Sequence, residues 1–131
     1  MKLLLPPGWP RPRGYANGIS TRGRLIFTAG IVGWDEQECF VARDFVGQLR
    51  QVLKNTLAVL AEDGAGPEHV VRMTWYVVDR YEYVGRIQEV GAVYREIIGS
   101  HYPCMAAVQV AALMEPEARV EIETIAVVPE P

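Results

Sequence analysis

Two apolar runs near the C-terminal end of the chain dominate its hydrophobic pattern. Residues 105–113 are apolar on both alternating faces, which is typical of a central β-strand covered on each side. Residues 120–127 also have a strand pattern, but they include Glu121 and Glu123. A carboxylate on a mostly buried strand needs a partner or a chemical role. The rest of the chain is therefore interpreted as cover for these two strands, or as walls around Glu121.

Upstream of these runs, strand-like and helix-like stretches alternate. Residues 25–32 are rich in β-branched and aromatic side chains, which predicts a strand. With a short strand near Gly18 and a turn at 21–23, this strand is expected to form an N-terminal hairpin. Two further segments have apolar residues at every third or fourth position, as in an amphipathic helix. The predicted helices are 44–62 and 79–100, and the strand between them is 70–78.

The ends of the two predicted helices carry suitable capping residues. Asp44 and Asp79 are candidate N-caps, and Gly64 is a candidate for the left-handed residue that ends the first helix. The element order is β-β-α-β-α-β-β, an α+β class in which the two helices cover one face of a mixed sheet. The other face is then left apolar and open, and apolar patches of that size mark interfaces. We therefore expect an oligomer in which sheets pack face to face.

Length and charge narrow the class of protein. The 131 residues suit a single domain over 1–131, with a proline-rich irregular arm at 1–13. The net charge of −3 argues against general binding to nucleic acid or to a membrane surface, and Leu3–Leu5 is too short an apolar run for a membrane span. Cys39 and Cys104 form no disulfide framework, so the cytoplasm is the default location.

The basic residues of the chain are unevenly placed. Residues 1–34 contain five basic side chains and no acidic one. They either decorate a solvated surface or form a positive rim for an anionic ligand. These residues are Lys2, Arg11, Arg13, Arg22 and Arg24.

Few residues offer recognisable chemistry. The glycines of the first 34 residues lack the Gly-Lys-Ser/Thr of a phosphate loop, and His69 and His101 are too far apart to indicate a metal site. No motif assembles a Ser-His-Asp arrangement. Glu121 and Tyr15 remain as candidates. For Glu121 two interpretations stay open, an ion-pair partner at an interface and a catalytic group.

Several segments together resemble the Rid/YjgF family, often called RidA enamine/imine deaminases. The likeness runs from Arg13 to Val127. The matching segments are Gly14-Tyr15, 25–30, 48–55, 70–74, Tyr102-Pro103, 108–111 and 120–123. The resemblance implies a chorismate-mutase-like fold and a homotrimer with its sites in clefts between subunits. It also implies hydrolysis of reactive enamines and imines, such as 2-aminoacrylate, to a keto acid and ammonia without a cofactor or a metal.

The resemblance assigns candidate site residues by position. Tyr15 matches the family's N-terminal tyrosine, and Glu121 matches the glutamate thought to position or activate water. The family signature Pro-Ala-Arg-Ser-x-Val appears here as Pro103-Cys104-Met105-Ala106-Ala107-Val108. Met105 therefore stands where the family has the arginine that grips the substrate carboxylate. Ala107 replaces a cysteine of the family pattern, and Ala29 replaces a serine.

These departures change the expected pocket. The pocket is expected to be more apolar. Backbone amides near Met105, Ala106 and Ala107, and near Gly30, can stabilise a developing negative charge. Trp34 is expected to line the mouth of the pocket. Loss of the arginine contact costs about 1.5–3 kcal/mol, so an imine derived from an amino acid should bind roughly ten- to a hundredfold worse.

Two functional hypotheses follow. The first is a Rid-like hydrolase whose substrate lacks a carboxylate, or whose anionic substrate is held by Arg11, Arg13, Arg22 or Arg24. The alternative is a non-catalytic trimer of the same fold that binds a small molecule or regulates a partner.

Overall fold

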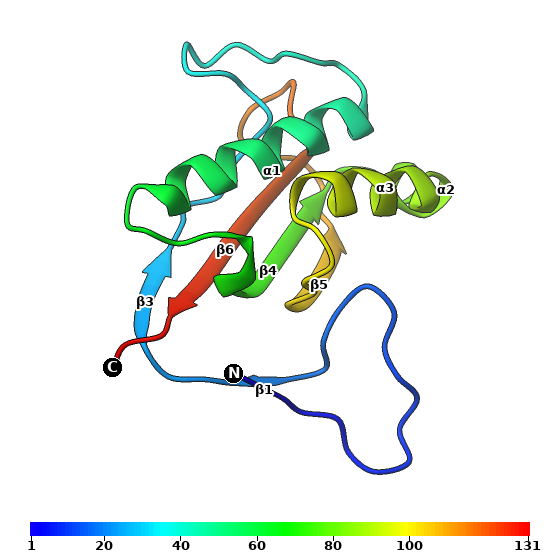
Figure 1. The fold of residues 1–131 in the computed structure, drawn as a ribbon. Helices are drawn as coiled ribbons and strands as arrows, with labels where there is room; N and C mark the ends of the chain where they lie inside the picture. The colour runs from blue at the N-terminus through cyan, green and yellow to red at the C-terminus, as the bar shows by residue number, and fades with distance from the viewer.

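A computed structural model describes residues 1–131. Two helices, α1 (Phe45–Ala61) and α3 (Ile87–Ile97), lie across one face of a four-stranded sheet (Figure 1). The sheet has the order β3-β6-β4-β5, in which only β4 and β5 run parallel. Its strands are β3 (Arg24–Phe27), β4 (Val70–Val77), β5 (Cys104–Gln109) and β6 (Val120–Val128). The expected α+β architecture, with helices on one face of a mixed sheet, is confirmed.

The first helix begins and ends where its sequence indicates. The Asp44 side chain accepts a hydrogen bond from the backbone amide of Gly47, which satisfies one of the free amides of the first turn. Gly64 follows the helix with φ of +74°, a conformation that glycine adopts without the Cβ penalty. A short 3₁₀ helix, η1 (Pro67–His69), then leads directly into β4.

The second predicted helix is divided in two. Residues 79–100 contain α2 (Arg80–Gly85) and α3, and Arg86 breaks the helical geometry between them with φ of −120° and ψ of +27°. Gly85 has a low helix propensity and ends α2 just before this break. Asp79 caps α2 as predicted, because its side chain accepts a hydrogen bond from the amide of Tyr81.

The predicted N-terminal hairpin does not form. The strand β2 (Ile19–Ser20) pairs with β1 (Lys2–Leu3), whereas β3 pairs with β6. The arm at 1–13 is therefore not wholly irregular, since it contributes β1. Gly23 separates β2 from β3, and its backbone lies so close to β6 that an added Cβ would be 2.2 Å from the carbonyl oxygen of Val128. The long apolar strand β6 offers β3 a better partner than the two residues of β2.

The strand expected at the centre of the sheet lies at its edge. β4 is the only strand that pairs with β5, and the last three residues of β5 are exposed. The apolar pattern of 105–113 predicts a covered surface, and a single chain leaves part of this strand exposed. The central strands are β4 and β6.

The core lies between the helices and the sheet. Its largest fully buried side chains come from α1 and the two central strands, and include Phe45, Leu49, Leu53, Trp75 and Ile122. The opposite face of the sheet has no helix on it (Figure 1). Leu25 and Phe27 are 59% and 64% exposed there. This open, partly apolar face is the one that the element order predicted.

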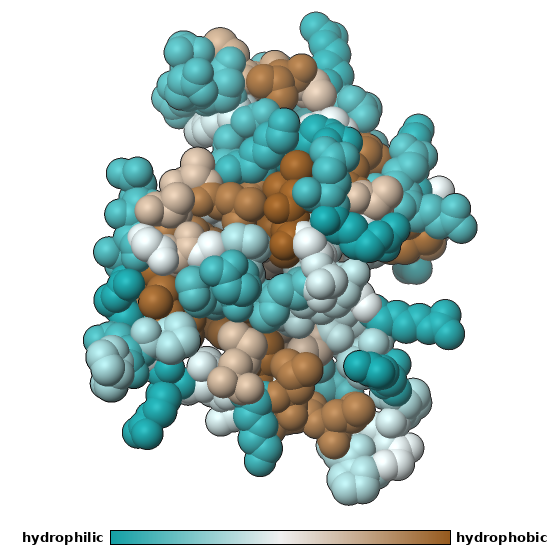
Figure 2. Space-filling model, viewed as in Figure 1, coloured by the Kyte–Doolittle hydropathy of each residue, from teal (hydrophilic) through white to brown (hydrophobic).

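The N-terminal arm also presents apolar side chains to solvent. It loops away from the sheet in Figure 1, and Figure 2 shows hydrophobic surface over it in the lower part of the same view. Leu3, Leu4, Leu5 and Trp9 are all exposed. The arm and the open sheet face are thus two surfaces that one chain leaves without apolar cover.

Candidate functional site

Glu121 lies on the open face of the sheet, in the central strand β6. It pairs in register with Tyr76 of β4. The turn after β3 passes directly beside it, so that a Cβ added to Gly30 would be 2.3 Å from Oε2 of Glu121. Any side chain at position 30 would require the Glu121 carboxylate to move. Glu121 and Gly30, which were predicted separately, are therefore neighbours in the structure.

The two carboxylates of β6 have different surroundings. Oε1 of Glu123 accepts a hydrogen bond of 2.6 Å from the hydroxyl of Tyr76, and this bond raises the pKa of Tyr76 above its ordinary value. The side chain of Glu121 makes no hydrogen bond or ion pair within the chain, although it is only partly exposed. Glu123 is occupied by a structural contact, and Glu121 is available for another partner.

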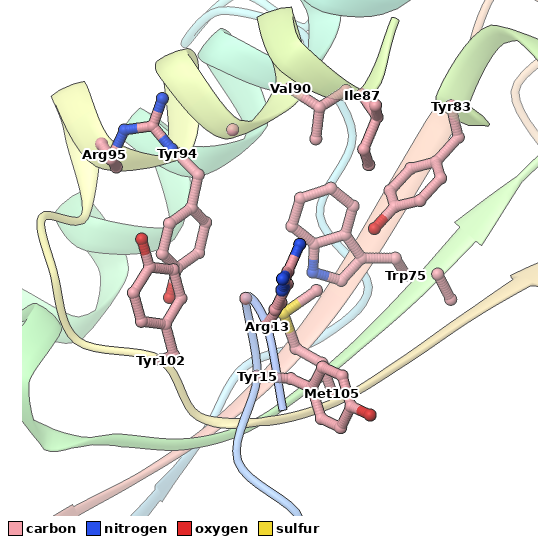
Figure 3. Close-up of a pocket in the computed structure, with 13 residues that line it drawn as sticks. Arg13, Tyr15, Trp75, Tyr83, Ile87, Val90, Tyr94, Arg95, Tyr102 and Met105 are labelled. Carbon is pink, nitrogen blue, oxygen red and sulfur yellow. The ribbon is translucent and has the colours of Figure 1, made fainter. Parts of the chain in front are cut away.

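Met105 and Ala107 lie on the helix-facing side of β5. They pair in register with Met73 and Trp75 of β4, whose side chains are buried beneath the helices. Both residues line a cavity of about 410 Å³ that extends under α3 (Figure 3). Tyr15 lines the same cavity, because the amide of Ala16 donates a hydrogen bond of 2.9 Å to the carbonyl of Pro103 and fastens the chain to the start of β5.

The predicted site residues thus fall into two groups within one chain. Glu121, Gly30 and the adjacent Ala29 lie at the open face of β6. Tyr15, Met105 and Ala107 line the cavity on the other side of the sheet.

Two further predicted residues lie outside the cavity. Ala106 pairs in register with Thr74, between two cavity-facing neighbours, and so points to the open face. Trp34 packs against Phe40, with ring centroids 5.9 Å apart, and does not line the cavity. Within one chain Trp34 therefore does not share the cavity of Met105, and its place at the mouth of the pocket stays a prediction.

The structure distinguishes the four arginines that were candidate anchors. Arg13 lines the same cavity as Met105. Arg11 lies in an adjoining groove between the arm and His101, and Arg24 forms an ion pair with Asp63 after α1. Arg22 is exposed and lines neither hollow. Of the four, only Arg13 shares a cavity with Met105.

The sequence patterns did not assign several cavity residues to a site. Trp75 was read only as a strand residue and Tyr83 and Tyr94 as part of a helix stripe, yet all three line the cavity with Tyr102 and Arg95. The rings of Tyr94 and Tyr102 stack at a centroid distance of 5.3 Å, and burial raises the pKa of both Tyr83 and Tyr94. The concentration of aromatic residues between positions 75 and 102 was the available signal.

Comparison with known proteins places this fold in a family. The family model described as Endoribonuclease L-PSP matches residues 10–128. A RutC family protein from Pyrococcus abyssi is 32% identical over 119 residues, which cover 89% of each chain. The Escherichia coli protein named "Putative reactive intermediate deaminase TdcF" is 28% identical, over 86% of this chain and 85% of its own.

Solved structures agree with the sequence relatives. YyfB from Yersinia pestis, a protein of unknown function in the conserved Rid family, superposes with a TM-score of 0.81 at 31% identity. The match covers 97% of this chain and 98% of YyfB. The molecule is thus an α+β protein with two main helices on one face of a mixed sheet. It belongs to the Rid/YjgF family.

The fold contains neither a candidate membrane-spanning helix nor a candidate metal cluster. None of its helices is both long and apolar enough to cross a membrane. No cluster of three or more His, Cys, Asp or Glu side chains is placed to hold a metal ion.

Proposed function

We propose that this protein hydrolyses reactive imines or their enamine tautomers to a carbonyl compound and ammonia, as a Rid-type enzyme with an altered choice of substrate. The observation that carries the proposal is the Glu121 carboxylate, partly buried on a central strand, without an internal partner, and with Gly30 against it. Family membership and the TdcF relative support the reaction type.

Glu121 acts as the general base in this scheme. It accepts a proton from water while the water oxygen bonds to the C=N carbon, and the nitrogen takes up a proton to give a carbinolamine. The C–N bond then breaks, ammonia leaves, and the oxygen loses its proton as the C=O bond forms. Water and the imine supply all the atoms of the products. Backbone amides near Gly30 and Ala106 stabilise negative charge that develops in the transition state.

The protein acts as a homotrimer in this proposal. Glu121 and Gly30 lie on one side of the sheet, and Met105, Ala107 and Tyr15 lie on the other, so the two groups need a neighbouring copy to form one site. A cleft between subunits places Glu121 of one copy opposite Tyr15 and Met105 of the next, where the Tyr15 hydroxyl donates a hydrogen bond to the substrate. The exposed apolar side chains of the open sheet face support this assembly.

The trimer predicts a measurable mass. Light scattering on the purified protein should give three times the 14.6 kDa of one chain. Phe27→Asp, which puts a charge on the open face, should dissociate the assembly, because an unpaired carboxylate is costly to bury. Val59→Asp is the matched control, since Val59 is 46% exposed on α1, away from the sheet. A wild-type mass of one chain at micromolar concentration would contradict the trimer.

The hydrolysis itself is tested with imines generated in situ. A panel made from α-amino acids and from simple amines is followed with and without the protein, and an arginine-containing Rid enzyme serves as the positive control. The expected result is faster decay of at least one class in the presence of the wild-type protein. If no member of the panel decays faster while the control enzyme works, hydrolysis is excluded for these classes. Tight binding without turnover would then favour the non-catalytic trimer.

A further inference from the structure

The cavity under α3 has a defined chemical lining. Nine of its 13 lining residues are hydrophobic. Trp75 and Met105 come from the sheet, Ile87 and Val90 from α3, and the stacked rings of Tyr94 and Tyr102 lie together at one side (Figure 3). A volume of about 410 Å³ is within the range of small-molecule sites. The space suits one molecule with a flat or branched apolar body.

A buried donor in the wall of this cavity has no partner. Trp75 is 1% exposed, and its indole Nε1 makes no hydrogen bond in the structure. In Figure 3 the nitrogen lies on the side of the ring toward Arg13 and Met105. An unpaired buried N–H costs about 1–3 kcal/mol, so the protein gains if a ligand supplies an acceptor there. The ligand should therefore carry an oxygen or nitrogen acceptor next to its apolar body.

Arg13 brings an unpaired positive charge to the same cavity. Its side chain forms no ion pair, hydrogen bond or cation–π contact with another residue. Gly14, with φ of +79°, turns the chain between Arg13 and Tyr15, and the Ala16–Pro103 hydrogen bond fixes the turn against β5. The local backbone thus directs Arg13 over the cavity.

No acidic residue balances this charge. The charged residues of the lining are Arg13 and Arg95, and it contains no aspartate or glutamate. Arg95 lines the cavity from α3, next to Tyr94 in the sequence, and Arg13 lines it from the N-terminal segment. A concave apolar site with cations and no anions attracts an organic anion. A guanidinium also matches a carboxylate geometrically through paired N–H donors.

We infer that the cavity binds a 2-imino acid, or its enamine tautomer, that carries a large apolar side group, preferably aromatic. Arg13 anchors the carboxylate, the Trp75 N–H donates to a carboxylate or imine acceptor, and the side group lies against Ile87 and Val90. This assignment rests on the proposed function and names its substrate class. The sequence left two kinds of imine substrate open, one without a carboxylate and one that is anionic. This assignment favours the anionic one.

Binding of a stable product analogue tests the anchor without any turnover. Calorimetry on the intact protein compares phenylpyruvate with pyruvate, which lacks the apolar group, and with phenylacetone, which lacks the carboxylate. Wild type should bind phenylpyruvate at least about tenfold more tightly than either, because a charge-assisted hydrogen bond and a buried ring each contribute more than 1.4 kcal/mol. Arg13→Gln should weaken phenylpyruvate binding by roughly ten- to a hundredfold.

Two further variants make the result specific. Arg22→Gln removes an exposed arginine of the same N-terminal region and should leave binding unchanged. Trp75→Phe keeps an aromatic ring but removes the donor, and it should weaken binding of phenylpyruvate more than that of phenylacetone.

The outcomes separate this assignment from the proposed reaction. Equal binding of phenylpyruvate by wild type and Arg13→Gln, or equal binding of phenylacetone and phenylpyruvate, overturns the anchor even if imines are hydrolysed. Binding of phenylpyruvate that depends on Arg13 supports the anchor. If the same protein hydrolyses none of the imines, only the proposed hydrolase activity is contradicted. If the protein hydrolyses only amine-derived imines, and Arg13→Gln does so at the same rate, the proposed reaction is supported. The assignment of an anionic substrate is then contradicted.

Discussion

Glu121→Gln is expected to lower kcat/KM for imine hydrolysis by about a hundredfold or more, because glutamine keeps the shape of the side chain but cannot accept the proton from water. The fold should survive the change. Glu121 forms no internal hydrogen bond or ion pair that the substitution would break, and its neighbour Gly30 already accommodates a side chain of this size. The measurement is the rate of imine decay in the in situ assay, with thermal unfolding recorded for the same samples.

Glu123→Gln is the matched control for this experiment. Glu123 lies two residues further along the same face of β6, but its carboxylate is hydrogen-bonded to Tyr76 and is not beside Gly30. The control should keep turnover near the wild-type rate. If Glu121→Gln hydrolyses imines as fast as wild type, Glu121 is not the base, and its role reduces to an interface contact.

Gln48→Leu is expected to lower the free energy of unfolding by about 3 kcal/mol, because three partly buried backbone groups lose their hydrogen-bond partner. Gln48 is fully buried on α1. Its Nε2 donates to the carbonyls of Ala42 and Glu117 at 3.1 and 2.9 Å, and its Oε1 accepts from the amide of Arg119 at 2.7 Å. One side chain therefore connects α1 to the loop that precedes it and to the loop that precedes β6. Urea unfolding followed by circular dichroism measures the change.

Gln51→Leu provides the same substitution one turn away. Gln51 is only partly buried, and its side chain donates to Asn55 on the same helix. Its replacement should cost less than about 1 kcal/mol, since pairs of this kind stabilise a helix weakly. Equal losses for the two variants would show that the buried network of Gln48 contributes little beyond helix propensity.

The helices and the strand between them were the most predictable parts of the fold. The apolar period of 44–62 matches α1 to within one residue at each end, and the strand expected at 70–78 is β4. Both segments bury one continuous stripe or face against the rest of the same chain, so their patterns report local structure directly. The break at Arg86 was missed because the apolar stripe continues in step across it.

The edge position of β5 and the missing hairpin were less predictable for a common reason. An apolar pattern shows that a surface will be covered, but it does not name the partner strand. β5 has the composition of a central strand and lies at the edge, and β3 pairs with the distant β6 rather than with the adjacent β2. Strand pairing depends on cross-strand packing between residues far apart in the sequence.

The candidate site shows the same division. Alternation along one strand determines which residues of that strand share a face, so Met105 and Ala107 were expected together and lie together. Whether they share a face with Glu121 depends on the register of β4 against both β5 and β6. That register places Tyr76 with Glu121 on the open face, and Trp75 with Ala107 beneath the helices.

The sequence by itself determined the helices, the class of the fold, the open apolar face and the unusual position of Glu121. Only the tertiary structure decided that Arg13, rather than Arg11, Arg22 or Arg24, shares a cavity with Met105 and the indole of Trp75. The physical reason is that helices and strands follow from the local period of apolar side chains. A binding site depends instead on the long-range pairing that brings the N-terminal arm to the edge strand β5.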